Sequence, residues 1–194
     1  PDRPQFQDVI EHLIDGYLSL GGDRLFGNDN ALTGGIGYFR GKKVLLLGID
    51  KGKNTNDRIL KNFGMARPEG YRKAIRLMQL ANKFNLPVLS FIDTAGAYPG
   101  KGAEERGQAQ AIASCIDACL NLNTPMISTI LGEGGSGGAI ALTSGNVILM
   151  FEHSIFSVIS PEGCASILWR DVSKANEAAK ALRLTATDMK RLNI

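Results

Sequence analysis

The sequence predicts an α/β fold in which buried parallel strands alternate with helices. Two segments repeat the order strand, glycine-rich turn, helix. Residues 88–92 lead into DTAGAYPG at 93–100, and residues 126–131 lead into GEGGSGGA at 132–139. Such alternation is typical of parallel strands joined by right-handed crossovers, which bind ligands at the carboxyl ends of the strands. Both glycine-rich turns lie at such ends.

The third observation behind this fold class is the composition. The chain has 194 residues, of which 44% are hydrophobic and 21% are charged. This is enough for a substantial hydrophobic core, and no linker or low-complexity stretch divides the chain. The sequence therefore predicts one domain over residues 1–194.

The first third of the chain predicts a helix, a hairpin and a polar loop. Apolar residues spaced by three and four over 4–20 predict one helix. Short strands at 34–39 and 43–50 join at 40–41, as in a hairpin. The polar stretch 51–62 predicts a loop and a short helix with few core residues, which makes it a candidate for a surface function.

The remaining elements follow from periodicity and capping signals. Serine before proline is a good N-cap and first-turn pair for a helix. The predicted elements are a helix at 69–84 with an apolar stripe, a helix at 104–122 after the first glycine turn, strands at 147–151 and 155–159, a helix at 162–169 begun by Ser160 and Pro161, and two short tail helices capped by Ser173 and Thr187.

Composition also excludes several classes of protein. The longest apolar runs are far shorter than the roughly 18 to 20 residues that span a membrane, and no signal-peptide pattern opens the chain. Cys115, Cys119 and Cys164 lack zinc-like spacing and predict reduced core thiols, hence a cytoplasmic protein without a metal site. The net charge is +3, and the basic run at 40–61 is diluted by acidic residues. Such a run could contact phosphates or an acidic partner, but the dilution is more typical of a solvated surface, and we expect no nucleic acid partner.

The motif GEGGSGGA can be interpreted in several ways. Gly132, Gly134 and Gly137 fit a dinucleotide fingerprint, with Glu152 as the ribose-binding acid, but the acid comes too early and the helix is too short. The same letters contain G-x-S-x-G around Ser136, as in a serine hydrolase, but His153 follows too soon for the usual hydrolase order. A purely structural role, in which the glycines only permit close packing, also remains.

A further interpretation uses both glycine turns together. Backbone N–H groups at Gly96 and Ala97 could converge with those at Gly137 and Gly138, where a helix begins. Together they would form an oxyanion hole for an enolate-like anion. This chemistry needs no histidine or cysteine, and the sequence contains few of either.

Four runs of sequence resemble the alpha subunit of bacterial-type acetyl-coenzyme A carboxylase carboxyltransferase. They are NFGMARPEGYRKAIRLM at 62–78, IDTAGAYPGKGAEERGQ at 92–108, GEGGSGGA at 132–139 and SVISPEGCASILW at 157–169. The resemblance implies a crotonase-like (ClpP/crotonase) fold of repeated ββα units, in which paired backbone N–H groups stabilise oxyanions. It also implies that residues 1–194 lack terminal helical segments of the full subunit.

By this resemblance, the reaction is transfer of a carboxyl group from carboxybiotin on biotin carboxyl carrier protein to acetyl-CoA. The product is malonyl-CoA for fatty acid biosynthesis. The resemblance further implies a carboxyltransferase beta subunit in an α2β2 heterotetramer and a biotin carboxylase in the same complex. No cofactor is expected to be covalently bound, and zinc is expected only on the beta partner.

The resemblance and the glycine pattern together assign candidate site residues. The candidate oxyanion donors are the backbone N–H groups of Gly137, Gly138, Gly96 and Ala97. Carboxybiotin contacts are assigned to Gly134, Gly135, Ser136 and Tyr98, where Tyr98 could equally pack at an interface. Lys101 and Arg106 are candidate contacts for a carboxylate or for coenzyme A phosphates. The alternative is that they form ion pairs with the glutamates at 104–105 at the start of a helix.

Overall fold

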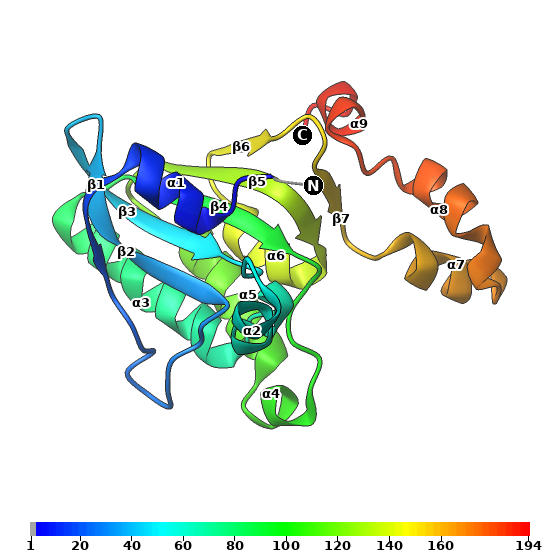
Figure 1. The fold of residues 1–194 in the computed structure, drawn as a ribbon, viewed down its shortest axis with the longest axis horizontal. Coiled ribbons are helices and arrows are strands. Elements are labelled where there is room, and N and C mark those ends of the chain that lie inside the picture. The colour runs from blue at the N-terminus through cyan, green and yellow to red at the C-terminus, as the bar shows by residue number, and fades with distance from the viewer. Residues whose placement is uncertain (1–2) are drawn as a thin grey trace.

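The computed structural model describes residues 3–194, which form a mixed sheet covered by helices (Figure 1). Within these residues the sheet has seven strands, six in the order β1-β2-β3-β4-β5-β6, with β7 paired to β5. The first three strands are antiparallel neighbours, and β3 to β6 run parallel. The predicted α/β class with parallel strands is therefore confirmed.

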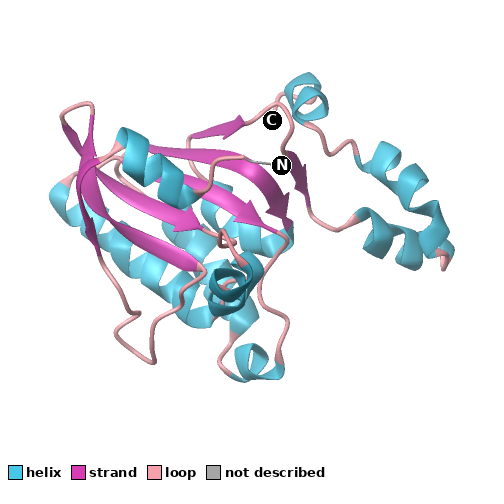
Figure 2. Ribbon diagram, viewed as in Figure 1, coloured by secondary structure: helices cyan, strands magenta, loops and turns pink. Residues whose placement is uncertain are grey.

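The strands and helices lie where most of the predicted elements were expected (Figure 2). The strands are β1 Asp15–Ser19, β2 Leu32–Phe39, β3 Lys42–Ile49, β4 Val88–Thr94, β5 Met126–Gly135, β6 Val147–Met150 and β7 Ile155–Ser157. The helices are α1 Phe6–Leu13, α2 Thr55–Leu60, α3 Pro68–Phe84, α4 Lys101–Glu105, α5 Gln108–Leu120, α6 Ser136–Thr143, α7 Pro161–Trp169, α8 Ala175–Leu182 and α9 Ala186–Arg191, with 3-10 turns at Asn62–Gly64 and Val172–Lys174.

The predicted hairpin is present between β2 and β3. Phe39 pairs with Lys42, and the two turn residues Arg40 and Gly41 have φ values of 49° and 76°. Two consecutive residues in the left-handed region match the right-handed twist of the strands they join. The local signal was therefore sufficient to predict this element.

The single helix predicted over 4–20 is wrong in its second half. Helix α1 ends at Leu13, and residues 15–19 form the edge strand β1, whose register shifts between Asp15 and Leu18, around Gly16 with φ of 59°. Strand β2 can pair with β1 because Gly35 has no side chain. A Cβ at this position would lie 2.3 Å from the Leu18 carbonyl oxygen, which is too close. Pairing with β2 has overridden a spacing that fitted a helix.

The helix predicted over 104–122 is divided. Helix α4 ends at Glu105, and Gly107, with φ of 78°, precedes a new helix α5. The Gln108 amide donates to the carbonyl oxygens of Ala66 and Tyr98, each at 2.9 Å. These bonds tie the start of α5 to the first glycine turn, which a continuous helix could not do.

Capping is confirmed at α7 and corrected at the tail helices. The Ser160 hydroxyl accepts the Gly163 N–H at 3.1 Å, as predicted. Helix α8 instead follows Lys174, which provides no side-chain cap, and α9 is capped by Thr185, whose hydroxyl accepts the Asp188 N–H at 3.2 Å. Ser173 and Thr187 do not cap these helices.

The core lies on both faces of β3. Leu45 and Leu47 pack with α3, α5 and α6 on one face, whereas Leu46 packs under Phe6 and Ile10 of α1 on the other. Figure 1 shows these helices on opposite sides of the sheet and α7 and α8 projecting away from it. The three cysteines are free and buried, as predicted. No helix among residues 3–194 has the length and hydropathy to cross a membrane.

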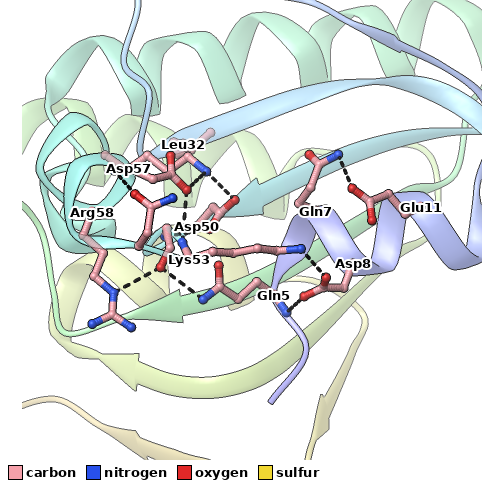
Figure 3. A network of polar contacts seen from close by, with 12 residues as sticks. Gln5, Gln7, Asp8, Glu11, Leu32, Asp50, Lys53, Asp57 and Arg58 are labelled. Carbon is pink, nitrogen blue, oxygen red and sulfur yellow. Dashed lines mark hydrogen bonds and ion pairs between the residues drawn. The ribbon is translucent and has the colours of Figure 1, made fainter. Parts of the chain in front are cut away.

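A polar network holds the start of α1 against the loop after β3 (Figure 3). The Gln5 amide and the Arg58 Nε both donate to the Gly52 carbonyl oxygen at 3.2 Å, and Lys53 pairs with Asp8 at 2.6 Å. Two cations of the basic run, Lys53 and Arg58, are therefore engaged within the fold. The network keeps Arg3, just before α1, beside the ends of β4 and β5.

Lys73 of α3 carries a charge but is only 2% exposed. Its Nζ donates to the Asn28 side-chain oxygen and to the Asp29 carbonyl oxygen, both at 2.7 Å. Burial lowers the pKa of Lys73 to about 8, although the nearby Asp29 carboxylate opposes the shift. A lysine with a depressed pKa is less favourable to the folded state while it is charged.

We expect the titration of Lys73 to make the free energy of unfolding rise with pH between about 8 and 10.5. In this range the unfolded chain binds more protons than the folded chain. Urea denaturation of the wild type and of Lys73→Met across this range measures the effect. The wild-type free energy of unfolding should rise relative to that of the variant, whose position 73 does not titrate. A difference that stays constant with pH would contradict the prediction.

Candidate active site

The two glycine turns meet at the carboxyl ends of β4 and β5. A Cβ placed on Gly135 would lie 2.2 Å from the Ala95 carbonyl oxygen, and one on Gly138 would lie 2.6 Å from the Ala97 nitrogen. Both distances are shorter than real Cβ atoms allow, so only glycine permits this approach of two backbones. The structure brings the two predicted halves of the site into direct contact.

The hydrogen bonds of the first turn distinguish among its candidate donors. The Gly96 N–H donates to the Thr94 hydroxyl at 3.0 Å, and the Tyr98 N–H donates to the Ala66 carbonyl oxygen at 3.0 Å. Gly96 was a candidate donor, but its N–H is already engaged. Among residues 3–194, the N–H groups of Ala97 and of Ala95 have no acceptor, so Ala97 is the predicted donor of this turn that is free.

The second set of donors comes from the start of α6. This helix begins at Ser136, so the N–H groups of Ser136, Gly137 and Gly138 belong to its first turn and have no acceptor within the helix. The positive end of the helix dipole lies at the same place. Gly138 is buried against the first turn, while Gly137 is half-buried and has room for a Cβ, which would lie 3.5 Å from Ile112.

Other residues of the glycine motif form one wall of a cleft of about 320 Å³. Gly134 and Gly135 line it together with Ser136, as predicted for the ligand-contacting part of the motif. The opposite wall was not predicted as part of the site and consists of β7, the start of α7 and one residue before α9: Ile155, Ser157, Ile159, Ser160, Pro161, Glu162 and Leu184. The family-like run at 157–169 was the available signal for this wall.

Ser136 has the backbone strain of a nucleophile elbow but no base. Its φ of 55° is unusual for a residue with a side chain. His153 is exposed in the loop between β6 and β7, and His12 bonds the Asp8 carbonyl oxygen at 2.8 Å. No hydrogen bond among residues 3–194 joins either histidine to Ser136, which disfavours the hydrolase interpretation.

The dinucleotide interpretation also loses its support. A Cβ placed on Gly132 would lie 2.2 Å from the Arg3 Nε, so this glycine makes room for an arginine rather than for a pyrophosphate. Glu152 is exposed after β6. Gly132 and Gly134 both lie within strand β5, and not in a turn that opens a helix as the fingerprint requires.

Tyr98 packs against its own turn. The Arg67 guanidinium lies 4.7 Å from the centre of the Tyr98 ring, and a Cβ placed on Gly100 would lie 2.2 Å from the ring. The ring is half-buried, so one part of its surface stays accessible. These contacts fix its orientation, and a contact between Tyr98 and a substrate remains a proposal.

The cations after the first turn form ion pairs within the chain. Lys101 is 89% exposed and pairs with Glu105 at 3.4 Å, as in the alternative interpretation. Arg106 pairs with the buried Glu69 at 2.8 Å and lies 4.5 Å from the centre of the Phe26 ring. Its partner is therefore on α3 and is not one of the neighbouring glutamates, and a contact between Arg106 and a substrate remains a proposal.

Solved structures with a similar fold are carboxyltransferases. Transcarboxylase 12S matches 98% of this chain and 37% of its own, with a TM-score of 0.83 and 19% identity. The beta subunit of P. aeruginosa geranyl-CoA carboxylase matches 95% of this chain and 36% of its own, with a TM-score of 0.74 and 19% identity. At this identity the likeness concerns the fold alone, and it confirms the expected crotonase-like fold.

Curated relatives are far more similar in sequence. The acetyl-coenzyme A carboxylase carboxyl transferase subunit alpha of Zymomonas mobilis is 59% identical over all 194 residues, and that of Methylobacterium sp. is 60% identical. The chain spans 62% and 61% of the lengths of these two relatives. The model of the acetyl co-enzyme A carboxylase carboxyltransferase-like family matches residues 1–194, and the chain belongs to this family.

Proposed function

We propose that the chain carries half of the active site for carboxyl transfer from carboxybiotin to acetyl-CoA, which yields malonyl-CoA for fatty acid biosynthesis. The observation that carries this proposal is the contact between the two glycine turns. There the free N–H of Ala97 lies against Gly138 in the first turn of α6. Backbone donors held in this way suit an oxygen that becomes negative during the reaction.

In the proposed reaction, that oxygen belongs to the carboxyl donor, carboxybiotin. When the carboxyl group leaves carboxybiotin, negative charge develops on the ureido oxygen of the ring. Donors at Ala97, Gly137 and Gly138 would stabilise this charge more strongly in the transition state than in the ground state, which is the requirement for catalysis. The cleft beside Gly134 to Ser136 would hold the ring, and Tyr98 would pack against it. The released ring nitrogen would then remove the methyl proton of acetyl-CoA.

The partners follow from the same reaction. A beta subunit would provide a second oxyanion hole for the acetyl-CoA enolate and the zinc ribbon of the complex, in an α2β2 assembly. Biotin carboxyl carrier protein would deliver the carboxyl group after biotin carboxylase has loaded it. The family and the hexameric assembly of one structural neighbour support this arrangement. A cytoplasmic location is proposed from the three free cysteines. Lys101, exposed at the start of α4, remains a candidate contact for coenzyme A phosphates.

Reconstitution tests the proposal. The whole subunit is assayed alone and with its beta partner for transfer of the carboxyl group from malonyl-CoA to biocytin. We expect activity only in the mixture, because each chain would supply one oxyanion hole. Full activity without the beta chain would reject the proposal. If the serine hydrolase interpretation held instead, Ser136→Ala would abolish turnover, whereas here Ser136→Ala should keep most of the activity.

A further inference from the structure

Strand β5 bulges just before it reaches the cleft. Ile92 of β4 pairs with Ile130 of β5, but two residues later Thr94 pairs with Gly134, four residues further along β5. The extra residues of β5 leave the regular ladder between β4 and β5. The ladder resumes at Thr94 and Gly134, but the residues between the two pairings, which include Glu133, must be held by other contacts.

Asp93 provides an acceptor at this bulge. Its carboxylate accepts the backbone N–H of Glu133 at 2.9 Å, the residue directly before Gly134. The side chain is buried, with Asp93 only 2% exposed, and the Arg3 guanidinium donates to both carboxylate oxygens at 2.8 and 2.9 Å. A buried carboxylate bonded in this way holds one strand against the next.

Lys51 attaches the same bulge from a second direction. Its Nζ forms ion pairs with Asp93, at 3.3 Å, and with the Glu133 carboxylate. The stem of Lys51 is itself confined, because a Cβ placed on Gly64 would lie 2.7 Å from its Cγ. Glu133 is thus held through its backbone by Asp93 and through its side chain by Lys51.

We propose that Lys51 and Asp93 are positioning residues that fix the distance between the two glycine turns and thereby align the backbone donors for carboxyl transfer. This inference rests on the proposed function. Because the turns touch at Gly135 and Gly138, a small shift of β5 relative to β4 would move the α6 donors away from Ala97. Neither residue needs to contact a substrate for this role.

The test compares two lysines in similar surroundings. Lys51 is 21% exposed and bridges two carboxylates, and Lys61 is 19% exposed and bridges the carboxylates of Asp50 and Asp57. Only the pairs of Lys51 reach β5. Lys51→Met and Lys61→Met are each made in the whole subunit, reconstituted with the beta chain and assayed for malonyl-CoA-dependent carboxyl transfer to biocytin. Urea denaturation measures the stability of both variants.

We expect Lys51→Met to lower kcat by about 10- to 100-fold while KM for both substrates stays within about twofold, because misplaced donors weaken mainly the transition state. Lys61→Met should keep kcat within about twofold at a similar loss of stability. Lys51→Arg, which keeps the charge, should restore part of kcat. If Lys51→Met fails to fold, Glu133→Gln replaces it, because the Glu133 side chain is 34% exposed. Loss of its negative charge should also lower kcat.

Several outcomes would overturn the positioning role. One is a Lys51→Met or Glu133→Gln enzyme with wild-type kcat. Another is an equal loss of kcat in Lys51→Met and Lys61→Met, which would indicate a general effect of stability. A rise in KM alone would indicate a binding role. Failure of the proposed function looks different, because the wild-type complex itself would then lack transfer activity.

Discussion

Replacing Gly138 with alanine is expected to lower the kcat of carboxyl transfer by about 10²- to 10³-fold, the loss typical of one displaced oxyanion donor. The added Cβ would lie 2.6 Å from both the Ala97 nitrogen and the Gly96 carbonyl carbon. Both are backbone atoms, which cannot rotate aside as a side chain can. The first turn must therefore move, and the Ala97 N–H moves with it.

The matched control is Gly137→Ala, one residue earlier in the same helix. The nearest atom to its added Cβ would be a methyl group of Ile112 at 3.5 Å, which is an ordinary contact. This variant should keep kcat within about threefold, and it should gain up to about 1 kcal/mol of stability because alanine favours the helix. Steady-state kinetics with malonyl-CoA and biocytin compares the two. Equal activity of the two variants would contradict the prediction.

Elements with a local signal were predictable from the sequence. The apolar stripe and early proline of α3, the turn at Arg40 and Gly41 and the cap at Ser160 each lie within the segment that they shape. Strand β1 has no such signal, because its conformation depends on the space that Gly35 leaves in β2. Periodicity alone assigned this segment to the preceding helix.

The candidate site, like the fold, has features that the sequence predicts and features that it does not. The composition of the two glycine turns predicted a candidate oxyanion site, and the resemblance to the family predicted its substrate. The sequence could not show which donors are free, since Thr94 engages the N–H of Gly96 through a fold-dependent contact. Nor could it show the role of Lys51, which lies 82 residues before Glu133 in the chain. Long-range ion pairs of this kind leave no pattern in one sequence.

A second large effect, on stability, is expected at Asp29, in the loop before β2. Its carboxylate is 3% exposed and accepts two backbone N–H groups, from Arg67 at 2.8 Å and from Leu32 at 2.9 Å. It thus joins the start of β2 to the start of α3. The same charge favours the protonated form of the buried Lys73.

Asp29→Ala should lower the free energy of unfolding by about 3 to 5 kcal/mol, because it leaves two N–H groups without their acceptor and Lys73 without its compensating charge. Asp29→Asn, which keeps an acceptor oxygen, should lose less. Asp171→Ala is the matched control, since Asp171 also accepts a backbone N–H, that of Ser173 at 3.0 Å, but on the exposed surface, and its loss should cost much less. Urea denaturation of the variants gives the ranking. A loss at Asp29 no larger than that at Asp171 would show that burial of this carboxylate does not determine its contribution to stability.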